Sequence, residues 1–176
     1  MLAELTLSAL VLLAAGAAWC DVRERRIPNA LTAAGLVGAL LLRVPLGLAA
    51  IWMGLAGAGI ALALSLVFFL AGGMGGGDVK LLVAVGAFLG PHRLWPGLLA
   101  MALTGGLMAA WLIVRRGAMA ETAANIHTLW ITLGRRTFTG WKGEESEAAL
   151  TLDTPGALTV PYGVAIAVGA LVGWFM

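Results

Sequence analysis

Long apolar runs separated by short polar stretches extend over most of the chain. A membrane-spanning helix needs about 20 consecutive, mostly apolar residues. Six segments approach this length: Leu2 to Cys20, Ala30 to Leu42, Leu46 to Ala71, Val79 to Gly90, Pro96 to Val114 and Leu158 to Trp174. The second and fourth segments are short, so their ends must snorkel or the bilayer must thin around them. The pattern predicts an all-α fold, a polytopic membrane helix bundle of about six transmembrane helices.

Composition supports a membrane protein and excludes several other classes. The 176 residues are 61% hydrophobic and only 11% charged, and the mean hydropathy is +0.97. This length allows several spans but no large soluble domain, so we expect one integral-membrane domain over residues 1–176. The net charge of +2 gives no indication of a nucleic-acid partner, whereas the lipid bilayer is an expected one. The single cysteine, Cys20, excludes an internal disulfide and a multi-cysteine zinc site, and we expect no metal and no cofactor.

The distribution of basic residues predicts the orientation. If the N-terminus lies outside, only Arg43 and Arg93 of the 11 Lys and Arg residues face outward. The other nine face the cytoplasm, as the positive-inside rule requires. Both termini of a six-span bundle would then lie outside. The longest polar stretch, residues 115–157, would form a cytoplasmic loop inserted between the fifth and sixth helices.

Two carboxylates stand apart from the other acidic residues. Asp21 follows the first apolar segment and Asp78 opens the fourth, so both should lie at the cytoplasmic face. The remaining acids are typical of solvated surface. Two converging carboxylates can share a proton, so that one accepts a proton from water while the other donates a hydrogen bond to a carbonyl oxygen. Asp21 and Asp78 are therefore candidate catalytic residues.

A glycine run, "GGMGGG", directly precedes Asp78. Gly75, Gly76 and Gly77 lack side chains, so their backbone can adopt positive φ and let a substrate strand approach closely. Tight helix packing explains such glycines equally well, and we expect it for "GLAGAG" at Gly54 to Gly59.

Three motifs resemble the type IV prepilin peptidases, a branch of the GxGD-type intramembrane aspartic proteases. "GGGDVK" contains the G-x-G-D signature, and "DVRERRIPN", Asp21 to Asn29, is similar to the other half of the active site. "VPYGVAIAVG", Val160 to Gly169, is similar to the segment that opens the last helix of the family. The motifs occur in the family's order on a chain with the expected number of spans.

The resemblance implies a function. It makes Asp21 and Asp78 the catalytic pair of an aspartic endopeptidase in the bacterial inner membrane. The substrate would be a prepilin or pseudopilin whose short basic leader is cut at the cytoplasmic face, before an apolar helix. The chain resembles the short peptidases of Tad/Flp pili, because it lacks the paired Cys-x-x-Cys motifs of larger members that also methylate the product. We therefore expect leader removal without N-methyltransferase activity. The oligomeric state and the identity of the pilin stay open.

The segments around the two aspartates have local explanations too. Pro28 should stop a helix that continues from Asp21, and Asn29 should cap the second span with its side chain. Lys80 matches a basic residue common in the family and has no assigned catalytic role. A different class of function also accounts for the carboxylates, namely a small transporter or channel subunit that uses Asp21 and Asp78 to relay protons or bind a cation. That alternative leaves the glycine run and the "RERRIPN" segment without an explanation.

Overall fold

Helices make up the described structure. The computed structural model describes residues 1–71, 73–117 and 162–176, and within these ranges it contains no β-strand. The α-helices are α1 (Leu2–Glu24), α2 (Asn29–Arg43), α3 (Leu48–Leu70), α4 (Gly76–Arg116) and α6 (Tyr162–Phe175), with a short 3-10 helix at Val44–Leu46. The expected fold class, an all-α membrane bundle, is confirmed. Most of the predicted loop at residues 115–157 lies outside the described residues.

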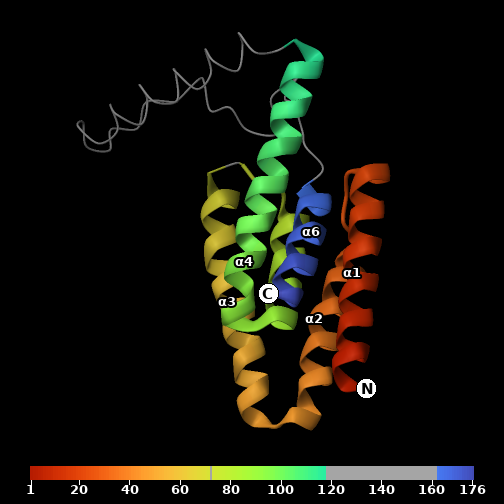
Figure 1. Ribbon diagram of the computed structural model, residues 1–176, viewed down its shortest axis with the longest axis vertical. Coiled ribbons are helices and arrows are strands. Elements are labelled where there is room, and N and C mark those ends of the chain that lie inside the picture. The colour runs from red at the N-terminus through yellow and green to blue at the C-terminus, as the bar shows by residue number, and fades with distance from the viewer. Residues whose placement is uncertain (72, 118–161) are drawn as a thin grey trace, which may run out of the picture.

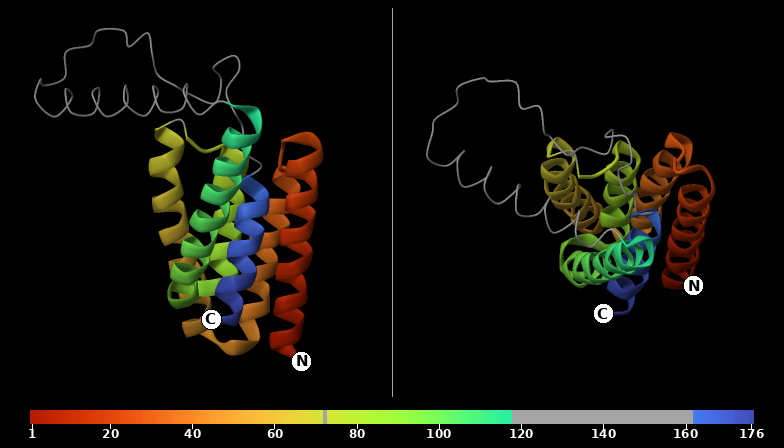
Figure 2. Two further views of the ribbon diagram at one scale, coloured as in Figure 1. Left: turned by 45° about the horizontal axis from the view of Figure 1, so that its top comes forward. Right: turned by 90° about the horizontal axis from the view of Figure 1, so that it is seen from above.

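The helices run side by side and alternate in direction (Figures 1 and 2). α1 rises from the N-terminus, α2 returns, α3 rises again and α4 starts beside the top of α3. α6 descends to the C-terminus, so both chain ends lie at the same end of the bundle. The last residues of α1 and the first residues of α4 lie together at the opposite end. This end is called the carboxylate end below, because it carries Asp21 and Asp78.

The fourth and fifth predicted segments form one interrupted helix. Within α4, Gly90 has a non-helical backbone with φ 71° and ψ 176°. The chain reverses there, and the second arm runs back toward the carboxylate end (Figure 1). The two arms of α4, together with α1, α2, α3 and α6, correspond to the six predicted segments. The second arm starts at Pro91 and not at Pro96, so the polar residues His92 and Arg93 belong to the helix.

Arg43 closes the break in α4. The carbonyl of Ala87 would normally accept from the N–H of residue 91, but Pro91 has none. Arg43 Nε donates to that carbonyl oxygen at 2.9 Å, and Arg43 Nη2 donates to the carbonyl of Phe88 at 2.9 Å. Nη1 donates to the carbonyl of Ala50 on α3 at 3.1 Å. One guanidinium from α2 therefore satisfies the two carbonyls that the break in α4 leaves without helical donors, and it links them to the first turn of α3.

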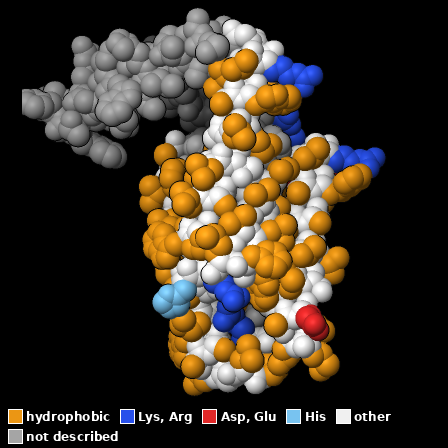
Figure 3. Space-filling model, viewed as in Figure 1, with side chains coloured by type: hydrophobic (Ala, Val, Ile, Leu, Met, Phe, Trp, Pro, Cys, Tyr) orange, Lys and Arg blue, Asp and Glu red, His pale blue; other side chains and the backbone are white. Residues whose placement is uncertain are grey.

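Apolar side chains cover the outside of the bundle. Four described helical segments, Leu2–Glu24, Asn29–Leu46, Leu48–Leu70 and Gly76–Arg116, are long and apolar enough to cross a membrane, and α6 is a shorter apolar helix. Large hydrophobic residues such as Leu12, Leu41, Val67 and Leu107 are exposed on these segments. Figure 3 shows hydrophobic side chains over most of the visible face. Such a surface fits hydrocarbon and not water.

Small residues bring the helices into close contact. A Cβ added at Gly57 on α3 would clash with the carbonyl oxygen of Gly86 and the Cα atom of Gly90, both on α4. Gly97 on α4 and Gly169 on α6 face each other in the same way. Lipid tails are as apolar as the helix surfaces, so close backbone packing replaces the hydrophobic effect as the driving force. The packing expected for "GLAGAG" is therefore confirmed at Gly57 but not at Gly59, which has no atom within 4 Å of an added Cβ.

These two glycines give a matched pair of substitutions. Gly57→Ala should destabilise the protein by about 1 to 3 kcal/mol, because backbone atoms of α4 must move away from the new methyl group. Gly59→Ala should change stability by no more than about 1 kcal/mol, toward greater stability, because alanine is the better helix former. Thermal unfolding of both variants in detergent measures the difference. Equal melting temperatures for the two variants would contradict the close contact between α3 and α4.

Candidate active site

Asp21 lies in the last turn of α1 and is buried, with an exposed fraction of 9%. The helix ends at Glu24, and the next residue, Arg25, adopts a left-handed conformation with φ 51°. The N–H of Arg25 donates to the carbonyl oxygen of Asp21 at 3.0 Å. This reversal turns the chain so that Ile27 becomes buried behind the site. The basic segment after Asp21 thus folds back over the end of the bundle.

Gly163 in the first turn of α6 holds the Asp21 carboxylate. Its backbone N–H donates to Asp21 Oδ2 at 2.7 Å, across 142 positions in the sequence. An added Cβ at Gly163 would lie 2.8 Å from Asp21 Cβ and 2.9 Å from Asp21 Oδ2. Glycine therefore lets the start of α6 approach the carboxylate closely enough to bond it. The sequence marked the segment around Gly163 by resemblance but gave no sign of this contact.

Asp78 is the third residue of α4 and is half-buried. The helix starts after Gly75, whose backbone is extended with φ −74° and ψ 149°, and the Asp78 carboxylate interacts with the Gly75 backbone. A Cβ at Gly75 would lie 3.1 Å from Asp78 Oδ2. The absence of a side chain at Gly75 thus leaves room for the carboxylate at the helix start.

The two carboxylates meet in one cavity. Asp21 and Asp78 are close enough to interact electrostatically, although they come from different helices. The cavity has a volume of about 320 Å³ and is lined by Asp21, Arg25, Arg26, Ile27, Asn29, Gly75, Gly76, Gly77 and Asp78. Every residue that the sequence singled out for the site therefore lies on it. Arg25 and Arg26 place positive charge beside the two carboxylates.

One local expectation is wrong. Asn29 does not cap α2, because its side-chain Oδ1 accepts from Lys80 Nζ at 2.9 Å and no side-chain cap is formed. The bond links the start of α2 to the first turn of α4.

None of the described glycines of the run before Asp78 has a positive φ. An added Cβ at Gly77 would lie 3.4 Å from Ile27 Cβ, an ordinary van der Waals contact, so the contact with Ile27 does not require glycine.

An apolar groove adjoins the polar cavity at Asn29. It has a volume of about 420 Å³ and lies between α2, α3 and the first arm of α4. Its lining includes Leu36, Leu62, Val79 and Val83 and reaches Lys80 at its polar end. The carboxylates thus lie beside a space that suits an apolar chain.

The described residues contain no group of three His, Cys, Asp or Glu side chains arranged to hold a metal ion. The chemistry open to the described site is that of two carboxylates. Such a pair can hold one proton between two oxygens that face the same space, and so act as acid and base on one bound molecule.

The fold and the site define a polytopic membrane protein with two acidic side chains in a cavity at one end of its bundle. The chain belongs to the type IV leader peptidase family, whose sequence model matches residues 7–114. The matched region contains Asp21, Asp78 and the glycines before Asp78, whereas Gly163 lies beyond it. No curated protein and no solved structure shows significant similarity to the chain. The protein is therefore a membrane peptidase, and the family favours this class over a transporter or channel.

The contact between α6 and Asp21 can be tested with a single methyl group. Gly163→Ala should lower peptidase activity at least about tenfold, because the new Cβ displaces the Asp21 side chain from its N–H donor. Gly106→Ala is the matched control, since an added Cβ there meets no atom within 4 Å. Initial cleavage rates, measured together with thermal unfolding, separate a local effect from loss of fold. Full activity in Gly163→Ala would show that the bond to Asp21 is dispensable.

Proposed function

We propose that the protein is an aspartic endopeptidase that removes the leader from prepilins or pseudopilins, with Asp21 and Asp78 as the catalytic pair. One observation carries the proposal: two carboxylates, distant in sequence, line one cavity at one end of a membrane bundle. Burying charge in a membrane protein is unfavourable, so a buried and a half-buried carboxylate that share one cavity at the end of a membrane bundle point to function. The peptidase family supplies the reaction class.

The proposed mechanism is general acid and base catalysis by the pair. A water molecule between the carboxylates gives a proton to the ionised partner and attacks the peptide carbonyl carbon. The protonated partner donates a hydrogen bond to the carbonyl oxygen as negative charge develops there. Collapse of the tetrahedral intermediate breaks the C–N bond, and the leaving amine takes up a proton. The N–H of Gly163 holds the Asp21 side chain in place during this cycle.

The shape of the site supports a substrate that is polar on one side of the cut and apolar on the other. The polar cavity and the apolar groove between α2, α3 and α4 share the lining residue Asn29. A prepilin has this character, because its leader precedes an apolar helix. We propose leader removal alone, as in the peptidases of Tad/Flp pili, without methylation of the new N-terminus.

The proposed location is the bacterial inner membrane, with the site at the cytoplasmic face. Basic residues gather at the carboxylate end, namely Arg23, Arg25, Arg26 and Lys80. The second arm of α4 also ends there, at Arg116. Clustering of Lys and Arg is typical of the cytoplasmic side.

The catalytic pair is tested by isosteric substitution. Asp21→Asn and Asp78→Asn should each abolish leader removal, because asparagine keeps the shape but cannot exchange a proton with water or substrate. Glu24→Gln is the control, since Glu24 is an exposed acid on the same helix as Asp21. Mass spectrometry of a co-expressed prepilin reports both cleavage and any methyl group on the product.

Wild-type cleavage by either Asn variant would refute the pair as catalytic. Loss of activity in Glu24→Gln to the same degree would mean that a general loss of negative charge, and not the pair, explains the effect. A methylated product would overturn the proposal of leader removal alone.

Orientation is tested by cysteine labelling in a Cys20→Ala background. A cysteine introduced at Gly117 should react with a membrane-impermeant reagent only from the cytoplasm, because it follows Arg115 and Arg116 at the carboxylate end. A cysteine at Leu2 or Phe175 should react only from outside. Labelling of both ends of the bundle from the same side would exclude a membrane-spanning arrangement, and the opposite pattern would place the active site outside.

A further inference from the structure

A second cavity lies at the end of the bundle opposite Asp21 and Asp78, called the arginine end below. Its volume is about 460 Å³, larger than the cavity around the carboxylates. It is enclosed by the start of α1, the ends of α2 and α6, the start of α3 and the break in α4. Apolar side chains, among them Leu42, Met53 and Phe88, form most of its wall.

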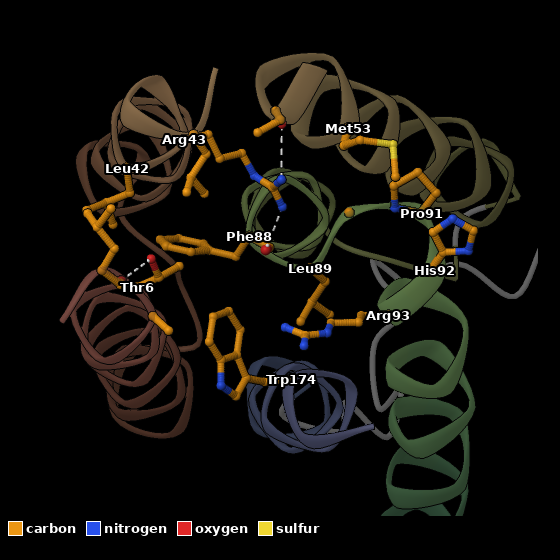
Figure 4. Close-up of a pocket in the computed structure, with 15 residues that line it drawn as sticks. Thr6, Leu42, Arg43, Met53, Phe88, Leu89, Pro91, His92, Arg93 and Trp174 are labelled. Carbon is orange, nitrogen blue, oxygen red and sulfur yellow. Dashed lines mark hydrogen bonds between the residues drawn. The ribbon is translucent and has the colours of Figure 1, made fainter. Parts of the chain in front are cut away.

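Two arginines share this cavity. Figure 4 shows Arg43, from α2, and Arg93, from the second arm of α4, reaching toward the same space from opposite sides. Their guanidinium groups are near enough to repel each other electrostatically. They are also the only described Lys or Arg residues at the arginine end. In the proposed orientation both arginines lie on the outer side of the membrane, where basic residues are disfavoured. The bonds of Arg43 at the break in α4 account for Arg43 but not for Arg93.

Among the described residues, no acidic side chain lines the cavity beside Arg43 and Arg93. Glu4, the nearest acid along the chain to the α1 residues of the lining, pairs with the N-terminal amine of Met1 and does not line the cavity. The lining therefore concentrates positive charge without any counter-charge.

The guanidinium groups still have N–H donors to offer. Arg43 uses three N–H groups on the carbonyls of Ala50, Ala87 and Phe88. An arginine has five such donors, so two are left for a ligand. Arg93 lies over the ring of Trp174, with its Cζ 5.1 Å from the ring centroid, and this contact leaves its donors free. The backbone bonds fix Arg43 and the indole ring positions Arg93, so both donor sets are held in place.

We propose that this cavity binds a phosphate-bearing anion at the membrane surface, held between Arg43 and Arg93. Guanidinium groups match the geometry and charge of phosphate oxygens. The start of α1 and the turn between α2 and α3 extend beyond the break in α4 (Figure 1) and lie at the level where lipid headgroups meet a bundle of this length. The apolar wall that leads toward the break suits the adjoining acyl chains. The source is therefore a net-anionic lipid headgroup or a free phosphate. A zwitterionic headgroup fits less well, because no acidic side chain of the lining would pair with its ammonium group.

The experiment uses the purified full-length protein in detergent, with phosphatidylglycerol, phosphatidylcholine of the same acyl chains, and inorganic phosphate as separate probes. Native mass spectrometry measures lipid retention, and thermal unfolding measures stabilisation by each probe. We expect the wild-type protein to retain phosphatidylglycerol over phosphatidylcholine. Arg93→Gln should weaken this retention about tenfold, because it removes one charged donor set while leaving all backbone bonds in place.

Arg115→Gln is the matched control. Arg115 also lies over a tryptophan on the second arm of α4, 4.9 Å from the Trp111 ring centroid, but at the carboxylate end. The Arg115→Gln variant should retain phosphatidylglycerol as the wild type does. The Arg93→Lys variant should keep most of the affinity for this lipid because it keeps the charge. Substitution of Arg43 is not used as the test, since it also removes the bonds that close the break in α4.

The probes distinguish the two sources. Retention of phosphatidylglycerol that depends on Arg93, without stabilisation by inorganic phosphate, assigns the site to a lipid headgroup. Stabilisation by inorganic phosphate that depends on Arg93 assigns it to the free anion. Three results would each overturn the proposal. The first is equal retention of both lipids without an effect of phosphate. The second is an equal loss of lipid retention in Arg93→Gln and Arg115→Gln, and the third is no binding of any probe.

Discussion

The fold depends on a constraint that lipid imposes, namely that every backbone polar group in the membrane must find a partner inside the protein. Unbroken helices meet it by themselves, and the break at Gly90 does not. Pro91 removes the N–H that the Ala87 carbonyl needs, and Arg43 supplies its own donors to that carbonyl and the next one. An unpaired carbonyl in hydrocarbon is unfavourable by several kcal/mol. This one side chain therefore makes a sharp reversal within α4 compatible with the membrane.

The reversal brings α4 back to the end of the bundle where the last described helix starts. Its second arm runs from Gly90 to the carboxylate end, and α6 also begins at that end. The first turn of α6 then brings the N–H of Gly163 to Asp21. The hairpin of α2 and α3 has a similar effect on the other carboxylate, because it returns the chain to the level of Asp21 before α4 begins. The positions of Gly163 and Asp78 beside Asp21 thus depend on turns at the opposite end of the bundle.

The molecule has two polar ends with opposite character. The carboxylate end combines two acids with Arg25 and Arg26 in one cavity, so positive and negative groups offset each other. The cavity at the arginine end is lined by two arginines and by no described acid. Between these ends the bundle is apolar, both in its core and on its lipid-facing surface. This separation of charge places catalysis and anion binding, as proposed, on different sides of one membrane domain.

The sequence by itself determined the class of fold and the residues of the candidate site. Apolar segments of spanning length predict helices because the bilayer allows few alternatives, and two aspartates at segment ends stand out because charge is rare there. It did not predict that Asn29 bonds Lys80 and leaves α2 uncapped, that Gly163 bonds Asp21, or that Arg43 closes the break at Gly90. Each of these contacts joins residues far apart in the chain, and local pattern carries no information on which helices become neighbours. Only the tertiary structure decided them, through close glycine packing and the direction in which each helix leaves its turn.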